Sequence, residues 1–386
     1  MAYGTKCGEN ISDIFITEEE LVDSITTGPS YLTGSFYPGS TCYQSGTERE
    51  STDLIFKGTT SSHRAKLQCL SSSTASRFRM VVDGSNDHGQ LGNFTTINSI
   101  STNPIDCVDW VCGATGLDHT LAIRVDGSLW AWGRNNHNQI GDTNTISRSS
   151  PIQVSASGWK KVAAGVDNSF AISSNNQLYA WGKSDHGQTG IPTVSNNTLS
   201  TPLLVGSNYK CISAGCNFAI AIKTDNTLWT WGYNEDGRLG LGDTISRSSP
   251  VQLCSNKLWK KISAGERQSA AIDIDGNIYV WGCNGSANLG LGTTVPQMVS
   301  CPVQLPSSKQ WRDVSINNIA GAAISTEGSV YVWGINSSLM LGTGSTTTSL
   351  TLSSPTINCL SRYCMESVNV NVGGIAYQAR TNSVDQ

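Results

Sequence analysis

Residues 116–141 read GLDHTLAIRVDGSLWAWGRNNHNQIG, and this stretch holds the features that decide the fold. Two apolar runs, Leu121–Ile123 and Leu129–Trp132, flank an Asp-Gly pair that begins at Asp126, an arrangement typical of a β-hairpin. Gly133 follows the second run, where a residue without Cβ can take a positive φ or let another backbone approach. The stretch therefore predicts two antiparallel strands.

The Trp-Gly pair recurs along the chain at a nearly fixed interval. It stands at Trp132-Gly133, Trp181-Gly182, Trp231-Gly232, Trp281-Gly282 and Trp333-Gly334, so that successive glycines are 49, 50, 50 and 52 residues apart. The same step taken backwards reaches Gly84, in a copy that lacks the Trp, and then Gly34. A fixed period near fifty indicates an array of equivalent units, and seven glycines predict seven units. We expect the residues of the five complete pairs to be structural.

A second marker runs in phase with the first. It is an aromatic residue followed six positions later by a glycine or, once, by an asparagine: Trp110 with Gly116, Trp159 with Gly165, Tyr209 with Gly215, Trp259 with Gly265 and Trp311 with Asn317. In the strand before Gly133, Trp130 and Trp132 share one face while Leu129 and Ala131 share the other. Both faces are apolar, which predicts a sheet packed between two neighbouring sheets, as in a β-propeller.

The two ends of the chain complete the pattern. Val370–Val372 and Ala379–Arg380 match the first half of a unit, whereas Thr26–Gly34 matches only the second half. Pairing these half blades would remove exposed sheet edges. We therefore expect an all-β, seven-bladed β-propeller over residues 26–386, closed by strands from both termini, with residues 1–25 as an N-terminal arm or cap that holds the acidic run Glu18–Glu20.

Composition narrows the classes of partner. Only 14% of the 386 residues are charged and the net charge is −4, so the basic stripe that drives phosphate binding is missing from the sequence. The longest basic clusters are Lys160-Lys161 and Lys260-Lys261. The first twenty residues lack the apolar core of a signal peptide, and no run approaches the roughly 18 apolar residues that span a bilayer. We expect neither nucleic-acid binding nor membrane insertion.

The cysteines and histidines predict no metal site. The pairs Cys107/Cys112, Cys211/Cys216 and Cys359/Cys364 lack a second ligand cluster, and without a visible secretion signal we expect the 12 cysteines to be reduced and buried. Three histidines, His88, His137 and His186, each stand four residues after a repeat glycine, but the next units have Asp236 and Ser286 there. We interpret the histidines as turn residues.

No catalytic motif is present in the sequence. Nucleophile elbows, Walker loops, HExxH helices and paired acids are all missing, so the chain is expected to be non-enzymatic, without catalytic residues or cofactors. The segment TISRSSP occurs twice, at residues 145–151 and 244–250. Either it is a duplicated neutral connection, or Arg148 and Arg247 are exposed anchors of a partner-binding rim, since arginine is favoured at interfaces.

The pattern Gly-x-x-His-Thr, Asp-Gly, Leu-x-x-Trp-Gly and Gly-Gln-Leu-Gly, written almost whole by residues 116–141, resembles the regulator-of-chromosome-condensation repeat family over residues 26–386. The resemblance implies a propeller that binds other macromolecules. Family members include an exchange factor with an inserted β-wedge, for which the spacing between Gly84 and Gly334 leaves no room, and a photoreceptor with repeated Gly-Trp-Arg-His-Thr, which this chain lacks. The low charge and eroded repeats are similar to propellers encoded by bacteriophages.

These observations predict a non-enzymatic, protein-binding propeller. The first expectation is a structural or accessory component of a larger assembly, such as a phage virion, with other protein subunits as partners. The alternative is a soluble cytoplasmic regulator or inhibitor of a client protein. The corresponding locations are the virion and the cytoplasm.

Overall fold

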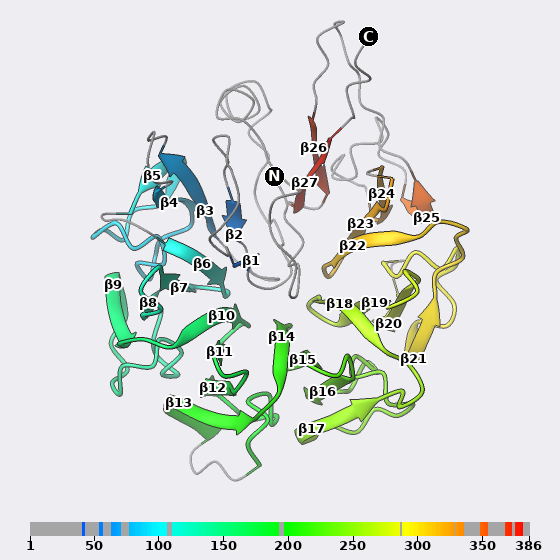
Figure 1. Cartoon of the computed structure of the whole chain (residues 1–386), viewed down its shortest axis with the longest axis horizontal. Coiled ribbons are helices and arrows are strands. Elements are labelled where there is room, and N and C mark those ends of the chain that lie inside the picture. Colours follow the sequence, from blue (N-terminus) through cyan, green and yellow to red (C-terminus); the bar gives the residue numbers. More distant parts are fainter. Residues whose placement is uncertain are drawn as a thin grey trace, which may run out of the picture.

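The computed structural model describes residues 41–42, 54–56, 63–70, 77–105, 110–192, 197–285, 288–327, 329–335, 348–353, 367–372 and 375–380. Every regular element in these residues is a β-strand. The strands form sheets that follow one another around a central axis (Figure 1).

Each sheet is built from consecutive strands. The first contains β2 (Leu54–Phe56), β3 (His63–Leu70), β4 (Arg77–Gly84) and β5 (Ser99–Pro104). The second contains β1 (Thr41–Cys42), β6 (Trp110–Thr115), β7 (His119–Arg124), β8 (Leu129–Gly133) and β9 (Arg148–Ser155). The third contains β10 (Trp159–Ala164), β11 (Asn168–Ser173), β12 (Leu178–Lys183) and β13 (Thr198–Gly206).

The next three sheets repeat this order. They consist of β14 (Tyr209–Ala214), β15 (Phe218–Lys223), β16 (Leu228–Gly232) and β17 (Arg247–Leu253); β18 (Trp259–Ala264), β19 (Gln268–Asp273), β20 (Ile278–Cys283) and β21 (Met298–Gln304); and β22 (Trp311–Ile316), β23 (Ala320–Ser325), β24 (Val330–Gly334) and β25 (Ser349–Ser353). A hairpin of β26 (Ser367–Val372) and β27 (Ile375–Arg380) follows. All pairings are antiparallel. The strands β10, β14, β18 and β22 lie nearest the axis in their sheets, and in the second sheet β1 lies on the inner side of β6 (Figure 1).

The all-β propeller architecture is confirmed. Within the described residues, six sheets have at least four strands and the C-terminal hairpin has two, so a seventh complete blade stays a prediction. The expected pairing of Thr26–Gly34 with the C-terminal strands lies outside the described residues. The diverged unit follows the repeat frame, because β4 ends at Gly84 with a φ of 113°, close to the 99° of Gly133.

The repeated tryptophan joins each blade to the preceding one. Its indole N–H donates a hydrogen bond to a backbone carbonyl in the preceding blade, at 2.9 Å from Trp132 to Gln90 and 3.0 Å from Trp231 to Gln188. The same bond links Trp181 to Gln139, Trp281 to Arg238 and Trp333 to Asn288. The Trp-Gly pair of one unit and the Gly-Gln-Leu-Gly motif of the preceding unit therefore form one contact between blades.

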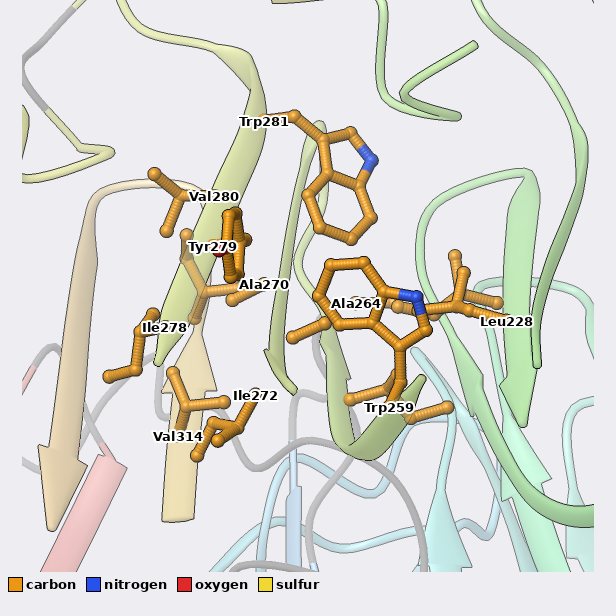
Figure 2. Close-up of a cluster of buried hydrophobic side chains, with 14 of the residues drawn as sticks. Leu228, Trp259, Ala264, Ala270, Ile272, Ile278, Tyr279, Val280, Trp281 and Val314 are labelled. Atoms are coloured by element: carbon orange, nitrogen blue, oxygen red, sulfur yellow. The ribbon is translucent and has the colours of Figure 1, made fainter. Parts of the chain in front are cut away.

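Aromatic and aliphatic side chains fill the space between the sheets. Figure 2 shows Trp259 of β18 below Trp281 of β20, with Leu228 of the preceding blade on the far side of Trp259. The two indole centroids are 6.5 Å apart and tilted by 60°. All three side chains are buried, and burial of groups of this size supplies most of the hydrophobic stabilisation between blades.

The expectation that both faces of the Trp-Gly strand are shielded from water is wrong at one position. Leu129, Ala131 and Trp132 are fully buried, but Trp130 is only half-buried. Its ring lies under the guanidinium of Arg124, 4.0 Å from the ring centroid, and its N–H donates to Ser128. Trp130 therefore keeps some contact with solvent, while Arg124 covers the face of its ring.

Gly133→Ala is expected to lower the free energy of unfolding by about 2 kcal/mol, and Gly158→Ala by only about 1 kcal/mol. Both residues have positive φ, 99° and 91°. A Cβ on Gly133 would lie 2.4 Å from the carbonyl oxygen of Asp118, whereas nothing lies within 4 Å of a Cβ on Gly158. Urea denaturation measures both values, and equal losses would show that packing against Asp118 is irrelevant.

Candidate functional site

The propeller has two faces of different construction. The loops that join the third and fourth strands of the blades, such as residues 134–147 and 233–246, lie at the ends of the blades where the Trp-Gly pair stands, and we call this the loop face. The opposite turn face carries the tight turns between the second and third strands, such as residues 125–128 and 224–227. Antiparallel strands place these two sets of connections at opposite ends of each sheet.

A buried asparagine organises the long loop in four of the units, at Asn86, Asn135, Asn234 and Asn284, whereas one unit has Ser184 at this position. Asn234 is fully buried, and its side-chain amide donates to the carbonyl oxygens of Asp243 and Ile245 at 3.0 and 3.2 Å. Its side-chain oxygen accepts a hydrogen bond from the backbone N–H of Leu239 at 2.9 Å. Asn86 and Asn135 make corresponding bonds in their own loops. A buried amide with its hydrogen bonds satisfied fixes the path of a loop that has no regular structure.

In four of the long loops, an aliphatic side chain at the same repeat position is exposed to solvent. Thirteen residues after the strand-ending glycine stand Ile97, Ile146, Ile245 and Val295, with exposed fractions of 74%, 61%, 65% and 71%. The equivalent positions 195 and 347 lie outside the described residues. Single exposed aliphatic residues are common on protein surfaces, but four at one position on one face form a recurring apolar rim. The sequence analysis missed these residues, although their period is visible in the printed chain.

Arg148 and Arg247 lie beside this rim, two residues after Ile146 and Ile245. The guanidinium of Arg148 donates to Asp142 through Nε at 3.1 Å and through Nη2 at 3.0 Å. Arg247 Nη2 donates to Asp243 at 2.6 Å. The two identical segments therefore fold in a similar way, with both arginines partly exposed and held by a carboxylate of their own loop.

The ion pair on the second loop affects its carboxylate. Burial works against ionisation of Asp243, but the hydrogen bonds from Arg247, Ile245 and Asn234 and the positive charge of Arg247 together outweigh it, so the pKa of Asp243 lies below its ordinary value. The carboxylate is thus charged at neutral pH and keeps the arginine ordered.

The three histidines lie on the loop face without converging. His137 Nε2 is 3.9 Å from a carboxylate oxygen of Asp167 in the next blade, and His186 stacks on Tyr233 with ring centroids 4.5 Å apart. In all three loops the backbone N–H of the histidine donates to the glutamine two residues later. The described residues contain no group of three or more His, Cys, Asp or Glu side chains that could hold a metal ion.

Where the fourth unit replaces glutamine with Arg238, an ion-pair cluster takes over the link between blades. Arg238 is buried, its guanidinium lies 4.8 Å from the ring centroid of Tyr233, and it pairs with Asp236. Asp236 also accepts a 2.9 Å hydrogen bond from Nε of Arg267 in the next blade. The sequence position of Arg238, inside the Gly-x-Leu-Gly motif, was the available signal for this role.

The expectation of reduced cysteines is wrong for two residues. Cys112 and Cys211 each take part in a disulfide. Both stand at the third position of an inner strand, and the backbone register places Cys42 of β1 opposite Cys112. Spacing along the sequence could not show that β1 adds to the inner edge of the second blade. The free thiols in the described part of the chain are Cys216, Cys254, Cys283 and Cys301; the first three are half-buried and Cys301 is exposed, so the expected burial is wrong for these four.

The part of the chain that the structure describes holds no helix with the length and hydrophobicity that a membrane crossing requires.

The repeat frame, the blade order and the tryptophan links can now be compared with known proteins. The profile of the RCC1-like domain matches residues 73–376. This chain belongs to that family. The resemblance to the regulator-of-chromosome-condensation repeats is thereby confirmed, while the likeness to bacteriophage members stays a prediction. No curated protein sequence matches the chain.

Solved structures of RCC1-like propellers share the fold at low sequence identity. The structure of yeast RCC1 (Prp20) bound to Kap60 aligns with a TM-score of 0.71 and 17% identity, covering 97% of this chain and 94% of that one. Prp20p from Saccharomyces cerevisiae, described with its binding properties to Gsp1p and histones, gives 0.70 and 18%, with 96% of both chains covered. Human WBSCR16 gives 0.66 and 20%, covering 82% of this chain and 84% of that one.

Proposed function

We propose that this RCC1-like chain is a non-enzymatic, protein-binding propeller whose loop face holds the partner. The observation that carries the proposal is the apolar rim of Ile97, Ile146, Ile245 and Val295, which four equivalent loops present to solvent. Burial of such side chains is favourable at about 25 cal/mol per Å² of apolar surface, and nothing in the propeller core requires them.

The arginines beside the rim fit the same role. A guanidinium that is already held by a carboxylate loses less side-chain freedom when a partner binds, so Arg148 and Arg247 are suited to contribute specific hydrogen bonds. The Prp20 propeller was solved bound to Kap60 and is described with its binding to Gsp1p and histones, which supports protein binding as a use of this fold.

The finer proposal is a component of a larger assembly, such as a phage virion, in preference to a cytoplasmic regulator. Its support is the disulfide state of Cys112 and Cys211. Disulfides persist in oxidising surroundings, which include particle surfaces, and are rare in the reducing cytoplasm. A soluble regulator of one client protein is the alternative, and its cysteines would be expected as thiols.

The double variant Ile146→Ser/Ile245→Ser is expected to keep the melting temperature within about 2 °C and to weaken partner binding at least about tenfold. The matched control is Val125→Ser/Ile274→Ser, which removes two exposed aliphatic side chains from the turn face, where they are 67% and 49% exposed. The readout is crosslinking mass spectrometry on material purified from the producing cells and on assembled particles.

Crosslinks from loop-face residues to a particle subunit would support the assembly proposal, and crosslinks to one soluble client would support the regulator. Equal binding by both double variants would remove the loop face as the partner surface. A specific contact should also bury roughly 1,000 Å² or more in a structure of the complex.

A further inference from the structure

Four successive inner strands carry a basic residue at the same place. Lys160 in β10, Lys210 in β14, Lys260 in β18 and Arg312 in β22 each follow the aromatic residue that begins the strand. The strand register shifts between the first and third residues of all four strands, so the basic residue lies at a β-bulge. We call these four residues the basic collar. The equivalent residue in β6 is Val111.

The collar lies beside the propeller axis at the turn face, on four consecutive blades. The four inner strands belong to consecutive blades and lie around the centre (Figure 1). Each of them begins beside a hairpin turn of the preceding blade, as shown by the hydrogen bonds from the backbone N–H of Trp159 to Gly127 at 3.1 Å and from Trp259 to Asn226 at 2.8 Å. Residues that are about 50 or more positions apart in the chain therefore lie near the axis on the same turn face.

The next residues along two of these strands are also lysines. Lys161 is half-buried and Lys261 is buried. Burial lowers the pKa of Lys161 to about 7, and repulsion from Lys261, Lys160 and Lys210 adds to the effect. Lysines of three different inner strands thus act on one another at the axis.

The hydrogen bonds of the collar go to uncharged oxygens. Lys160 Nζ donates to the side-chain oxygen of Asn176, and Lys210 Nζ donates to that of Asn226. These bonds hold the ammonium groups over the hairpin turns, where the nearby carboxylate of Asp225 partly compensates the charge of Lys210. Since both lysines are half-buried, their attraction for an anion is less screened than at a fully exposed site.

Exposed carboxylates in the hairpin turns limit the shape of the ligand. Asp126, Asp225 and Asp275 lie in turns of three different blades. A hydrogen bond from Ser128 holds the pKa of Asp126 below its ordinary value, and one from Thr227 does the same for Asp225. These negative charges repel any anionic ligand that covers the turns, which disfavours the wide phosphate backbone of a nucleic acid and restricts an acidic peptide to the basic residues of the inner strands.

We propose that the basic collar binds an acidic segment of a partner protein, whose Asp and Glu carboxylates accept hydrogen bonds from Lys160, Lys210, Lys260 and Arg312. The site lies on the turn face. The proposal is therefore independent of the loop-face proposal, and each can be tested separately.

The test uses a fluorescein-labelled hexaglutamate peptide and the full-length chain, with binding followed by fluorescence anisotropy at low salt. Lys160→Gln/Lys260→Gln is expected to weaken binding at least about tenfold, because it removes two charge-assisted hydrogen bonds. The control Arg134→Gln/Lys183→Gln makes the same change of charge on the loop face, where Arg134 pairs with Asp118 and Lys183 pairs with Asp185. It is expected to stay within about twofold of the wild type, since exposed pairs contribute little.

Three outcomes would overturn the proposal: no binding of the peptide by the wild-type chain, equal losses in the two double variants, or equally tight binding of a twelve-residue oligothymidine. The full-length variant Glu18→Gln/Glu19→Gln/Glu20→Gln addresses the source of the acidic segment. Unchanged affinity supports a partner protein, whereas tighter peptide binding would assign the collar to the chain's own acidic run and exclude the partner as its occupant. Melting temperatures of all variants verify that each is folded.

Discussion

Trp231→Ala is expected to lower the free energy of unfolding by about 3–5 kcal/mol, because the substitution leaves a large cavity between two blades. Trp231 is fully buried in β16, with its ring centroid 6.1 Å from that of Phe170 and 6.4 Å from that of Tyr209. Its indole N–H also donates to the carbonyl of Gln188 at 3.0 Å. Removal of the indole therefore costs packing and leaves a buried carbonyl without this donor.

The matched control is Trp229→Ala, two residues earlier in the same strand. Trp229 is half-buried, has the ammonium of Lys223 3.8 Å from its ring centroid and donates to the hydroxyl of Thr227. Its loss is expected to cost about 1 kcal/mol, the scale of a surface change with a cation–π contact. Urea denaturation gives both values. If the two substitutions cost the same, the burial of Trp231 is not the main link between the two blades.

The free energy of unfolding is expected to fall by about 1.4 kcal/mol per pH unit below pH 6.5 on account of His119 alone, reaching about 4 kcal/mol near pH 3.5. His119 is fully buried, and burial lowers its pKa to about 3. Because the folded pKa lies below the unfolded value of 6.5, the unfolded chain binds the additional proton between these two pH values. Stability is therefore complete above pH 6.5 and is lost as the pH falls.

The hydrogen bonds explain why this histidine stays neutral. The hydroxyl of Ser169 donates to the carbonyl of Gln139 at 2.6 Å, so at its 2.9 Å contact with His119 it must accept from Nε2–H. Nδ1 has no hydrogen-bond partner among the described residues. Protonation would place a charge and an unsatisfied donor in the wall between two blades.

His119→Gln is the informative variant, since Gln268 occupies the equivalent first position of β19. The slope of unfolding free energy against pH between 6.5 and 4.5 should be smaller in this variant by about 1.4 kcal/mol per unit, whatever its stability at pH 7. Carboxylates titrate in both proteins, so the difference between the two slopes isolates the histidine. Identical slopes would show that His119 reaches solvent when it is protonated.

Much of the fold could be predicted because each repeat is defined by residues that lie close together in the sequence. The hairpins need only an Asp-Gly or similar turn between two apolar runs, and the period of about fifty needs only the Trp-Gly pairs. The even spacing also marked the diverged unit at Gly84, where the structure ends β4 as expected. The strand bounds around Gly133 follow directly from these signals.

The candidate sites depend on relations that cross blades. Lys160 and Lys260 read as two short basic pairs in a weakly acidic chain, and only the bulged register of the inner strands places them at one mouth of the ring. Cys112 read as a reduced thiol, because the pairing of β1 with β6 leaves no trace in the spacing of cysteines. Arg148 was identified as an exposed anchor, but the carboxylate of Asp142 that holds it became evident only in the folded loop.

The sequence by itself determined the unit of this protein: a blade with an apolar strand on each side of a tight turn, a tryptophan before a glycine, and a loop that begins with that glycine. Such features depend on neighbours within a few residues, where alternation, turn geometry and the freedom of glycine act directly. Only the tertiary structure decided which groups from different blades meet, because those distances are set by the way whole sheets pack around the axis. The link from Trp231 to Gln188, the neutral state of His119 and the basic collar all arise there.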